Sequence, residues 1–169
     1  EEKKKVVLPY TDDFNETYKA AYGSDFFDTF PECIWELPDG RVSANRYHYH
    51  DHICERFANA FADNIGGWCH EHGIALTGHM MEEPTLASQT AALGEAMRSY
   101  RSFDLPGIDM LCDSRELTTA KQAQSAVHQY GRCGMTSELY GVTGWDFDFR
   151  GHKIHGDWQA ALGVTVRVQ

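Results

Sequence analysis

Segments with strand character alternate with helical segments along this chain, and this alternation limits the folds that the chain can adopt. The strand-like segments are short and apolar on both faces, as parallel strands covered by helices are. Strands are predicted at 74–81, 108–112, 134–137 and 164–168, and helices at 45–72, 85–101, 117–130 and 153–162. The pattern therefore predicts an α/β fold built from parallel βα repeats.

The spacing of the predicted strands favours part of a barrel. Their ends lie near residues 82, 113 and 138, so consecutive ends are 31 and 25 residues apart, the length of a βα unit. Right-handed crossovers make such a series part of a (β/α)8 barrel or an open sheet. A complete barrel needs about 250 residues, and the chain has 169. We expect one domain over residues 1–169, a partial TIM barrel, with an irregular excursion at about 24–45.

Carboxylates follow three of the predicted strands: Glu82 and Glu83, then Asp113, then Glu138. In a barrel all such positions meet at the face where active sites lie. Acidic residues are also common after strands as helix caps, and the Ser-Arg-Glu sequence that follows Asp113 favours a cap there. No helix start follows Glu138, which favours a functional carboxylate. Of Glu82 and Glu83, we expect one to be functional and the other to be a cap.

His79 and the aromatic segment 145–149 are the other candidates for binding a substrate. His79 lies in an apolar strand three residues before Glu82, so it reaches the pocket, pairs with an acid, or is a hydrogen-bonded core histidine. In segment 145–149 aromatic residues alternate with aspartates, beginning with Trp145 and Asp146. Aromatic faces beside carboxylates suit a sugar, although these rings could also be core beneath a loop.

The segment Tyr47-His-Tyr-His-Asp-His52 looks like a metal-binding cluster. It lies in the opening turns of the long predicted helix, where residues i and i+2 point apart. Surface or interface histidines are therefore expected. A metal-dependent hydrolase that uses these histidines together with His79 remains an alternative function.

Composition and missing motifs exclude several classes of protein. A net charge of -10 argues against nucleic-acid partners and against anionic membrane surfaces. The sequence has no apolar run of about 18 residues and no glycine-rich phosphate-binding motif. The five cysteines contain no CxxC pair, which indicates reduced thiols of an intracellular, cytoplasmic protein rather than a zinc site. We expect neither a metal nor a cofactor.

Three motifs resemble a known group of enzymes: Leu76-Thr-Gly-His-Met-Met-Glu-Glu83, Pro106-Gly-Ile-Asp-Met-Leu111, and Ser137-Glu-Leu-Tyr-Gly-Val-Thr-Gly-Trp-Asp-Phe147. Together they are similar to large bacterial glycoside hydrolases of the family 2 sugar-binding type. These enzymes are related in pattern to family 42 β-galactosidases and family 106 α-L-rhamnosidases. The resemblance covers nearly the whole chain. It implies a clan-A-like (β/α)8 barrel of which this chain is the second half.

The resemblance also implies roles for individual residues. In that clan a general acid/base glutamate follows the fourth strand and a nucleophile follows the seventh. Glu138 matches the seventh-strand position and the Glu82 segment matches the fifth. The fourth-strand acid should lie in a Thr-Asp-Glu-Pro-like motif before Pro9, where this sequence reads Glu-Glu-Lys-Lys-Lys-Val-Val-Leu. We therefore expect a fragment of a larger enzyme, inactive when isolated.

The predicted function is hydrolysis of glycosidic bonds by the parent enzyme. The expected catalytic residues are Glu138 and Glu82, and the expected sugar-contacting residues are His79, Glu83, Asp113, Trp145 and Asp146. The expected partners are a carbohydrate substrate and either a second copy of the chain or the rest of the barrel. A carbohydrate-binding or assembly module without catalytic activity is the other alternative.

Overall fold

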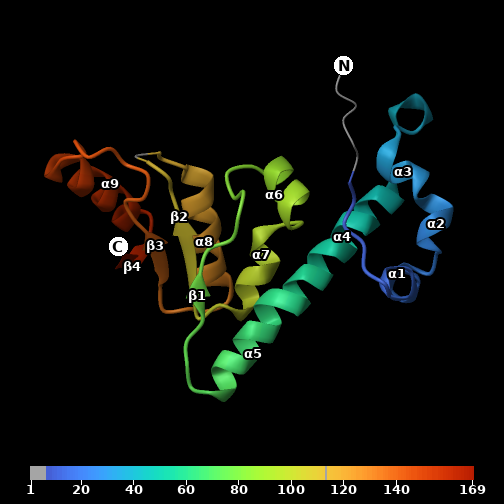
Figure 1. Cartoon of the computed structure of the whole chain (residues 1–169), viewed down its shortest axis with the longest axis horizontal. Helices are drawn as coiled ribbons and strands as arrows, with labels where there is room; N and C mark the ends of the chain where they lie inside the picture. The colour runs from blue at the N-terminus through green and yellow to red at the C-terminus, as the bar shows by residue number, and fades with distance from the viewer. Residues whose placement is uncertain (1–6, 113) are drawn as a thin grey trace. The chain divides into compact units, whose positions relative to one another are not determined.

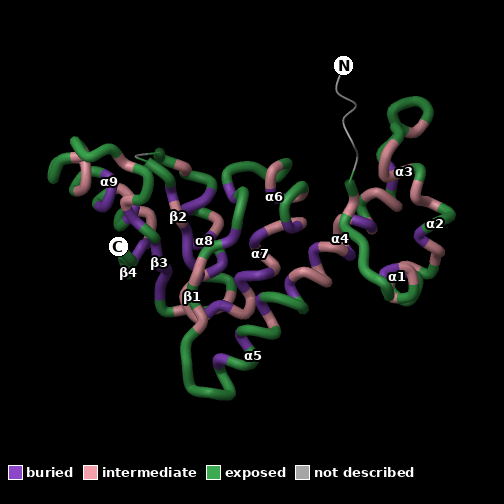
Figure 2. The backbone as a smooth tube through the Cα atoms, viewed as in Figure 1, coloured by how far each residue is buried: buried purple, intermediate pink, exposed green. Residues whose placement is uncertain are grey.

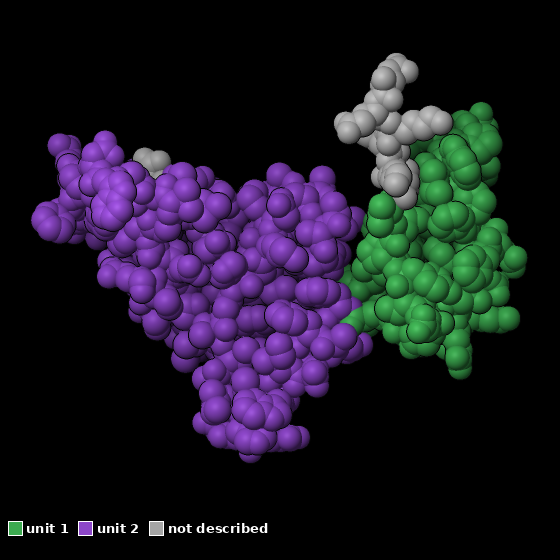
Figure 3. Space-filling model, in the orientation of Figure 1, with its two compact units in different colours: residues 1–56 green, residues 57–169 purple. Residues whose placement is uncertain are grey.

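The structure is a computed structural model that describes residues 7–112 and 114–169. The chain divides into two compact units, residues 1–56 and 57–169 (Figure 3). Within the described residues no helix combines the length and the apolar character needed to cross a membrane.

The first unit is helical and is built around aromatic side chains. Its elements are α1 (Phe14–Tyr22), α2 (Phe26–Thr29), α3 (Pro31–Ile34), the 3-10 turn η1 (Pro38–Gly40) and most of α4 (Ala44–Ala58). Phe14, Tyr18, Phe26 and Tyr49 form its buried core. The Arg46 guanidinium donates to the carbonyl oxygens of Glu32 at 2.8 Å and Trp35 at 2.7 Å, which fastens the irregular segment to α4.

The long helix predicted over 45–72 is present, with one irregular turn. It consists of α4, the π-helical turn η2 (Asn59–Asp63) and α5 (Asn64–Glu71). The glycine pair Gly66-Gly67, which could favour a kink, lies in α5 just after the irregular turn. Gly66 serves a close contact instead, because a Cβ atom there would lie 2.8 Å from the carbonyl oxygen of Ser102.

The second unit contains a four-stranded parallel sheet in the order β1-β2-β3-β4 (Figure 1). The strands are β1 (Thr77–Gly78), β2 (Leu105–Asp109), β3 (Met135–Glu138) and β4 (Val164–Val168). The connections contain α6 (Leu86–Ala92), α7 (Ala96–Ser99), the 3-10 turn η3 (Tyr100–Ser102), α8 (Leu117–Gln129) and α9 (Phe149–Ala161). The predicted α/β class with parallel strands is confirmed.

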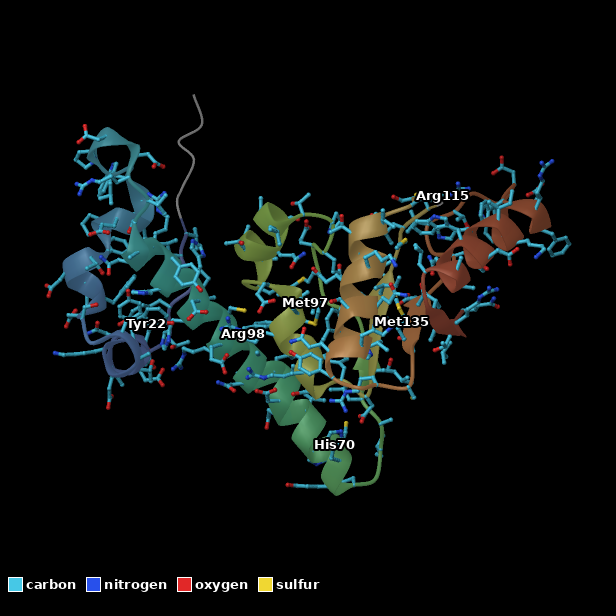
Figure 4. All side chains as sticks on the ribbon, turned by 180° about the vertical axis from the view of Figure 1, so that it is seen from behind. Tyr22, His70, Met97, Arg98, Arg115 and Met135 are labelled. Atoms are coloured by element: carbon cyan, nitrogen blue, oxygen red, sulfur yellow. The ribbon has the colours of Figure 1, made fainter. Side chains whose placement is uncertain are left out.

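One face of the sheet carries the main hydrophobic core (Figure 2). Ile108, Met135 and Val164 of the strands cluster there with buried alanines of α8, whose small side chains permit close packing. Met135 and Met97, both labelled in Figure 4, belong to this core. Because side chains alternate along a strand, Gly107 and Thr136 belong to the opposite face.

Gly107 allows β2 to lie close to its neighbours on that opposite face. A Cβ atom at this position would lie 2.4 Å from the carbonyl oxygen of Gly78 and 2.5 Å from Oγ1 of Thr136. The Tyr100 hydroxyl donates a hydrogen bond of 2.9 Å to the Gly107 carbonyl oxygen. Pro106-Gly107 is thus part of the sheet, although the predicted strand began only at Ile108.

Candidate functional site

Polar side chains from three adjacent strands meet at the carboxyl edge of the sheet. Asp109 and Glu138 end β2 and β3 and are direct partners in the strand register. His79 follows the last residue of β1. The hydroxyls of Thr77 and Thr136 lie 2.9 Å apart on one face of the sheet. Since His79 and Glu138 come two residues after these threonines, the strand alternation places them on the same face.

The imidazole of His79 lies between two carboxylates. Its Nδ1 is 3.4 Å from Oδ1 of Asp109, and its Nε2 is 3.6 Å from Oε2 of Glu138. Nδ1 is also 2.7 Å from the carbonyl oxygen of Met80. Because a carbonyl oxygen only accepts hydrogen bonds, Nδ1 carries the hydrogen in this arrangement. Nε2 then faces Glu138.

Glu83 is the buried carboxyl group of the site. Its side chain is 3% exposed, and its Oε1 has no hydrogen-bond partner among the described residues. Burial raises the pKa of Glu83 to about 7. The negative charge of Asp109 adds to this rise, whereas backbone hydrogen bonds and His79 oppose it. Burial disfavours the charged form of a carboxyl group, so Glu83 retains its proton much closer to neutral pH than an exposed glutamate does.

A tight turn directs Glu82 and Glu83 to different environments. Glu82 has φ of 60°, in the left-handed region, and its side chain is exposed. The turn is fastened to the start of α6, where Ser88 Oγ donates to the Glu82 carbonyl oxygen and Gln89 Nε2 donates to that of Glu83, each at 2.8 Å. Thr85 caps this helix by accepting a hydrogen bond from the Ser88 amide.

An open pocket of about 240 Å³ lies beside these groups. It is lined by His79, Met80, Met81, Glu82, Glu83, Pro84, Asp109, Leu111 and Glu116. Four of these residues are acidic, and none is lysine or arginine. The concave surface is therefore one that attracts positive charge.

The other sequence candidates lie elsewhere. Trp145 is fully exposed. Asp146 lines a second pocket of about 480 Å³, together with Cys112 and residues of the loop before α9. Asp113 lies outside the described residues. The structure thus brings His79, Glu83 and Glu138 together and leaves Glu82 at the pocket wall, with Trp145 and Asp146 apart from them.

Asp109 is the member of the site that the sequence interpretation missed. The predicted strand ran from Ile108 to Cys112 and ended at Asp113, four residues beyond the end of β2. Asp109 was therefore placed inside a strand and not at its end. A signal was present, because a charged residue inside an otherwise apolar strand is rare without a partner or a function.

The histidines of segment 48–52 pack against the aromatic core of the first unit. His52 is buried, 5.0 Å from the Phe14 ring between centroids, and its Nε2 is 3.0 Å from the Thr17 hydroxyl. His48 stacks on Tyr22, a residue labelled in Figure 4. The expectation of surface histidines is wrong for His52, because one face of α4 is turned to the core. Among the described residues, the group with metal-ligating atoms close together is His79, Glu83 and Asp109.

Comparisons with protein-family models, with curated proteins and with solved structures found no significant match to this chain. A proposal for the function therefore rests on the geometry at the carboxyl ends of β1, β2 and β3 and on the sequence motifs at those positions.

Proposed function

We propose that this chain is part of the catalytic barrel of a glycoside hydrolase, with β1–β4 as four consecutive strands of a (β/α)8 barrel. The sequential order of four parallel strands supports this proposal, because right-handed crossovers then place the connecting helices on one face of the sheet. The other face would be the barrel interior. Polar residues at the carboxyl ends of the strands are where barrel enzymes hold their active sites.

The observation that carries the proposal is a pair of carboxyl groups in opposite surroundings beside one imidazole. The Glu83 side chain is buried, whereas that of Glu138 is 62% exposed. Glycoside hydrolysis requires one carboxylic acid and one carboxylate. Contrasting environments are how two similar groups acquire these two roles.

Glu83 is the acid in this proposal and Glu138 is the nucleophile or base. Glu83 donates its proton to the glycosidic oxygen as the bond to the anomeric carbon breaks. Glu138 either attacks that carbon or removes a proton from the attacking water. His79 lies between Asp109 and Glu138 and positions the latter. Of the neighbouring pair Glu82 and Glu83, we assign the catalytic role to Glu83, because its side chain is the buried one.

The experiment measures turnover of a panel of aryl glycosides by the longest natural protein that carries this chain. Glu138→Gln and Glu83→Gln are each expected to lower kcat by about 10²- to 10⁴-fold, the usual contribution of acid or base catalysis. Glu82→Gln is the matched control and should retain nearly the wild-type rate. The loss in Glu83→Gln should shrink for dinitrophenyl glycosides, because that leaving group departs without protonation.

Two results would contradict the proposal. Near-wild-type turnover of Glu138→Gln would remove its catalytic role. A protein that binds sugars but hydrolyses none of the panel would instead be a carbohydrate-binding module.

A further inference from the structure

We infer that His79, Glu83 and Asp109 form a binding site for a divalent transition-metal ion. This goes beyond the proposed function, which uses no metal. One ring nitrogen of His79 and one carboxylate oxygen from each acid all lie within 4.8 Å of one another. Ligand atoms around one ion at about 2.1 Å lie roughly 3–4 Å apart. Small side-chain rotations would therefore bring the three donors into coordination.

The buried carboxyl group of Glu83 is the second, independent observation. Its Oε1 is enclosed and makes no hydrogen bond to the described residues, although the side chain lines the pocket. Buried polar atoms are nearly always paired, and an exception calls for an explanation. A cation in the pocket would supply the missing partner.

The charge around the pocket favours a cation. Its lining contains Glu82 and Glu116 besides Glu83 and Asp109, with no lysine or arginine. Asp109 and Glu138 are also side by side in the strand register, where like charges repel. No ammonium or guanidinium group of the pocket lining offsets this negative charge, so an external cation would relieve it.

The surroundings of His79 suit a metal ligand. An acceptor faces each ring nitrogen, the Met80 carbonyl at Nδ1 and the Glu138 carboxylate at Nε2. Whichever nitrogen binds the ion, the other can donate its hydrogen to one of these acceptors, as metal-bound histidines commonly do. An imidazole among carboxylates selects zinc, manganese, iron or cobalt over magnesium and calcium. Three protein ligands leave coordination positions open.

Metal binding and the proposed acid role use Glu83 in incompatible ways. A carboxylate oxygen that coordinates an ion carries no proton, so it cannot protonate a leaving group. A bound ion is therefore expected to inhibit the proposed glycosidase. Ion binding and hydrolysis have different readouts, so failure of one proposal can be told from failure of the other.

The experiment titrates the chain with Co²⁺ and follows the visible absorption bands of the bound ion. The wild-type chain should show saturable binding of one ion that Zn²⁺ displaces. Glu83→Gln and Asp109→Asn keep the side-chain size and should each weaken binding at least tenfold. Glu71→Gln and His72→Ala, which alter exposed groups that do not line the pocket, should bind like the wild type. Circular dichroism of every variant verifies that it is folded.

Unchanged Co²⁺ affinity in folded Glu83→Gln and Asp109→Asn would overturn the inference, and so would the absence of saturable binding in the wild type. Saturable binding without hydrolysis of any glycoside would support the metal site while the proposed function fails. Hydrolysis that stops with EDTA and returns with Zn²⁺ would support the metal site and overturn the acid role of Glu83.

Discussion

Replacing Glu83 by glutamine should change how the stability of the protein depends on pH. In the folded chain Glu83 keeps its proton up to about pH 7, whereas the ordinary pKa is 4.5. Between these two values the folded state binds more protons than the unfolded state. Stability is therefore lost as the pH rises through this window, because the buried group must ionise. Glutamine has nothing to ionise, so the variant should escape this loss.

The displacement of the Glu83 pKa from 4.5 to about 7 sets the size of the effect. One pKa unit corresponds to about 1.4 kcal/mol, so ionising Glu83 costs about 3 kcal/mol more in the folded chain than in the unfolded chain. The free energy of unfolding of Glu83→Gln, minus that of the wild type, should rise by this amount from pH 4 to pH 8. Most of the rise should fall between the two pKa values.

Urea unfolding followed by circular dichroism, with EDTA present, measures this difference at each pH. Glu82→Gln serves as the control, because it removes the exposed carboxyl group next to Glu83 and leaves the buried one in place. The reasoning would be refuted if the difference for Glu83→Gln stayed flat across the range or fell as the pH rose.

Three further predictions follow from packing and exposure. Gly107→Ala should destabilise the chain by about 1–3 kcal/mol, since the added Cβ meets backbone in the sheet. Gly67→Ala is the control and should not destabilise it, because a Cβ atom there meets nothing within 4 Å. Thermal unfolding compares the two variants. Burial, aided by the charge of Arg56, lowers the pKa of His52, so the free energy of unfolding should fall as the pH drops below 6.5. This fall should be less steep in His52→Gln, as unfolding followed by tyrosine fluorescence would show. Equal pH profiles of the two proteins would contradict this. Trp145→Ala should change the free energy of unfolding by less than about 0.5 kcal/mol because the ring is fully exposed. A raised KM of this variant for aryl glycosides would indicate that a sugar contacts the Trp145 ring.

The order and type of the main elements could be predicted from the sequence because their signals are local. The apolar period of the long helix and the alternating βα pattern each extend over many residues. The limits of β2 could not be predicted in this way. Pro106-Gly107 is a turn signal by composition, yet Gly107 is required where β1, β2 and β3 approach one another. That requirement depends on neighbours 29 or more residues away in sequence, Gly78 and Thr136.

The candidate site was predictable only in part, because some of its signals are local and others depend on the fold. His79 stood out because it interrupts an apolar segment, and Glu138 because it follows a predicted strand and precedes no helix start. Asp109 was missed through the misplaced strand end. The sequence did not distinguish Glu82 from Glu83, because the distinction depends on the backbone turn at Glu82 and on burial beneath the pocket.

The left-handed turn at Glu82 has a consequence for the evolution of this segment. A side chain at φ of 60° is in a conformation that glycine and asparagine adopt most easily. Position 82 should therefore drift toward those residues under neutral substitution. Position 83 should resist change, because a shorter or apolar side chain would abolish the buried carboxyl group. Two identical neighbouring residues would then be under different selection. An alignment of related chains would show position 82 varying beside a fixed position 83.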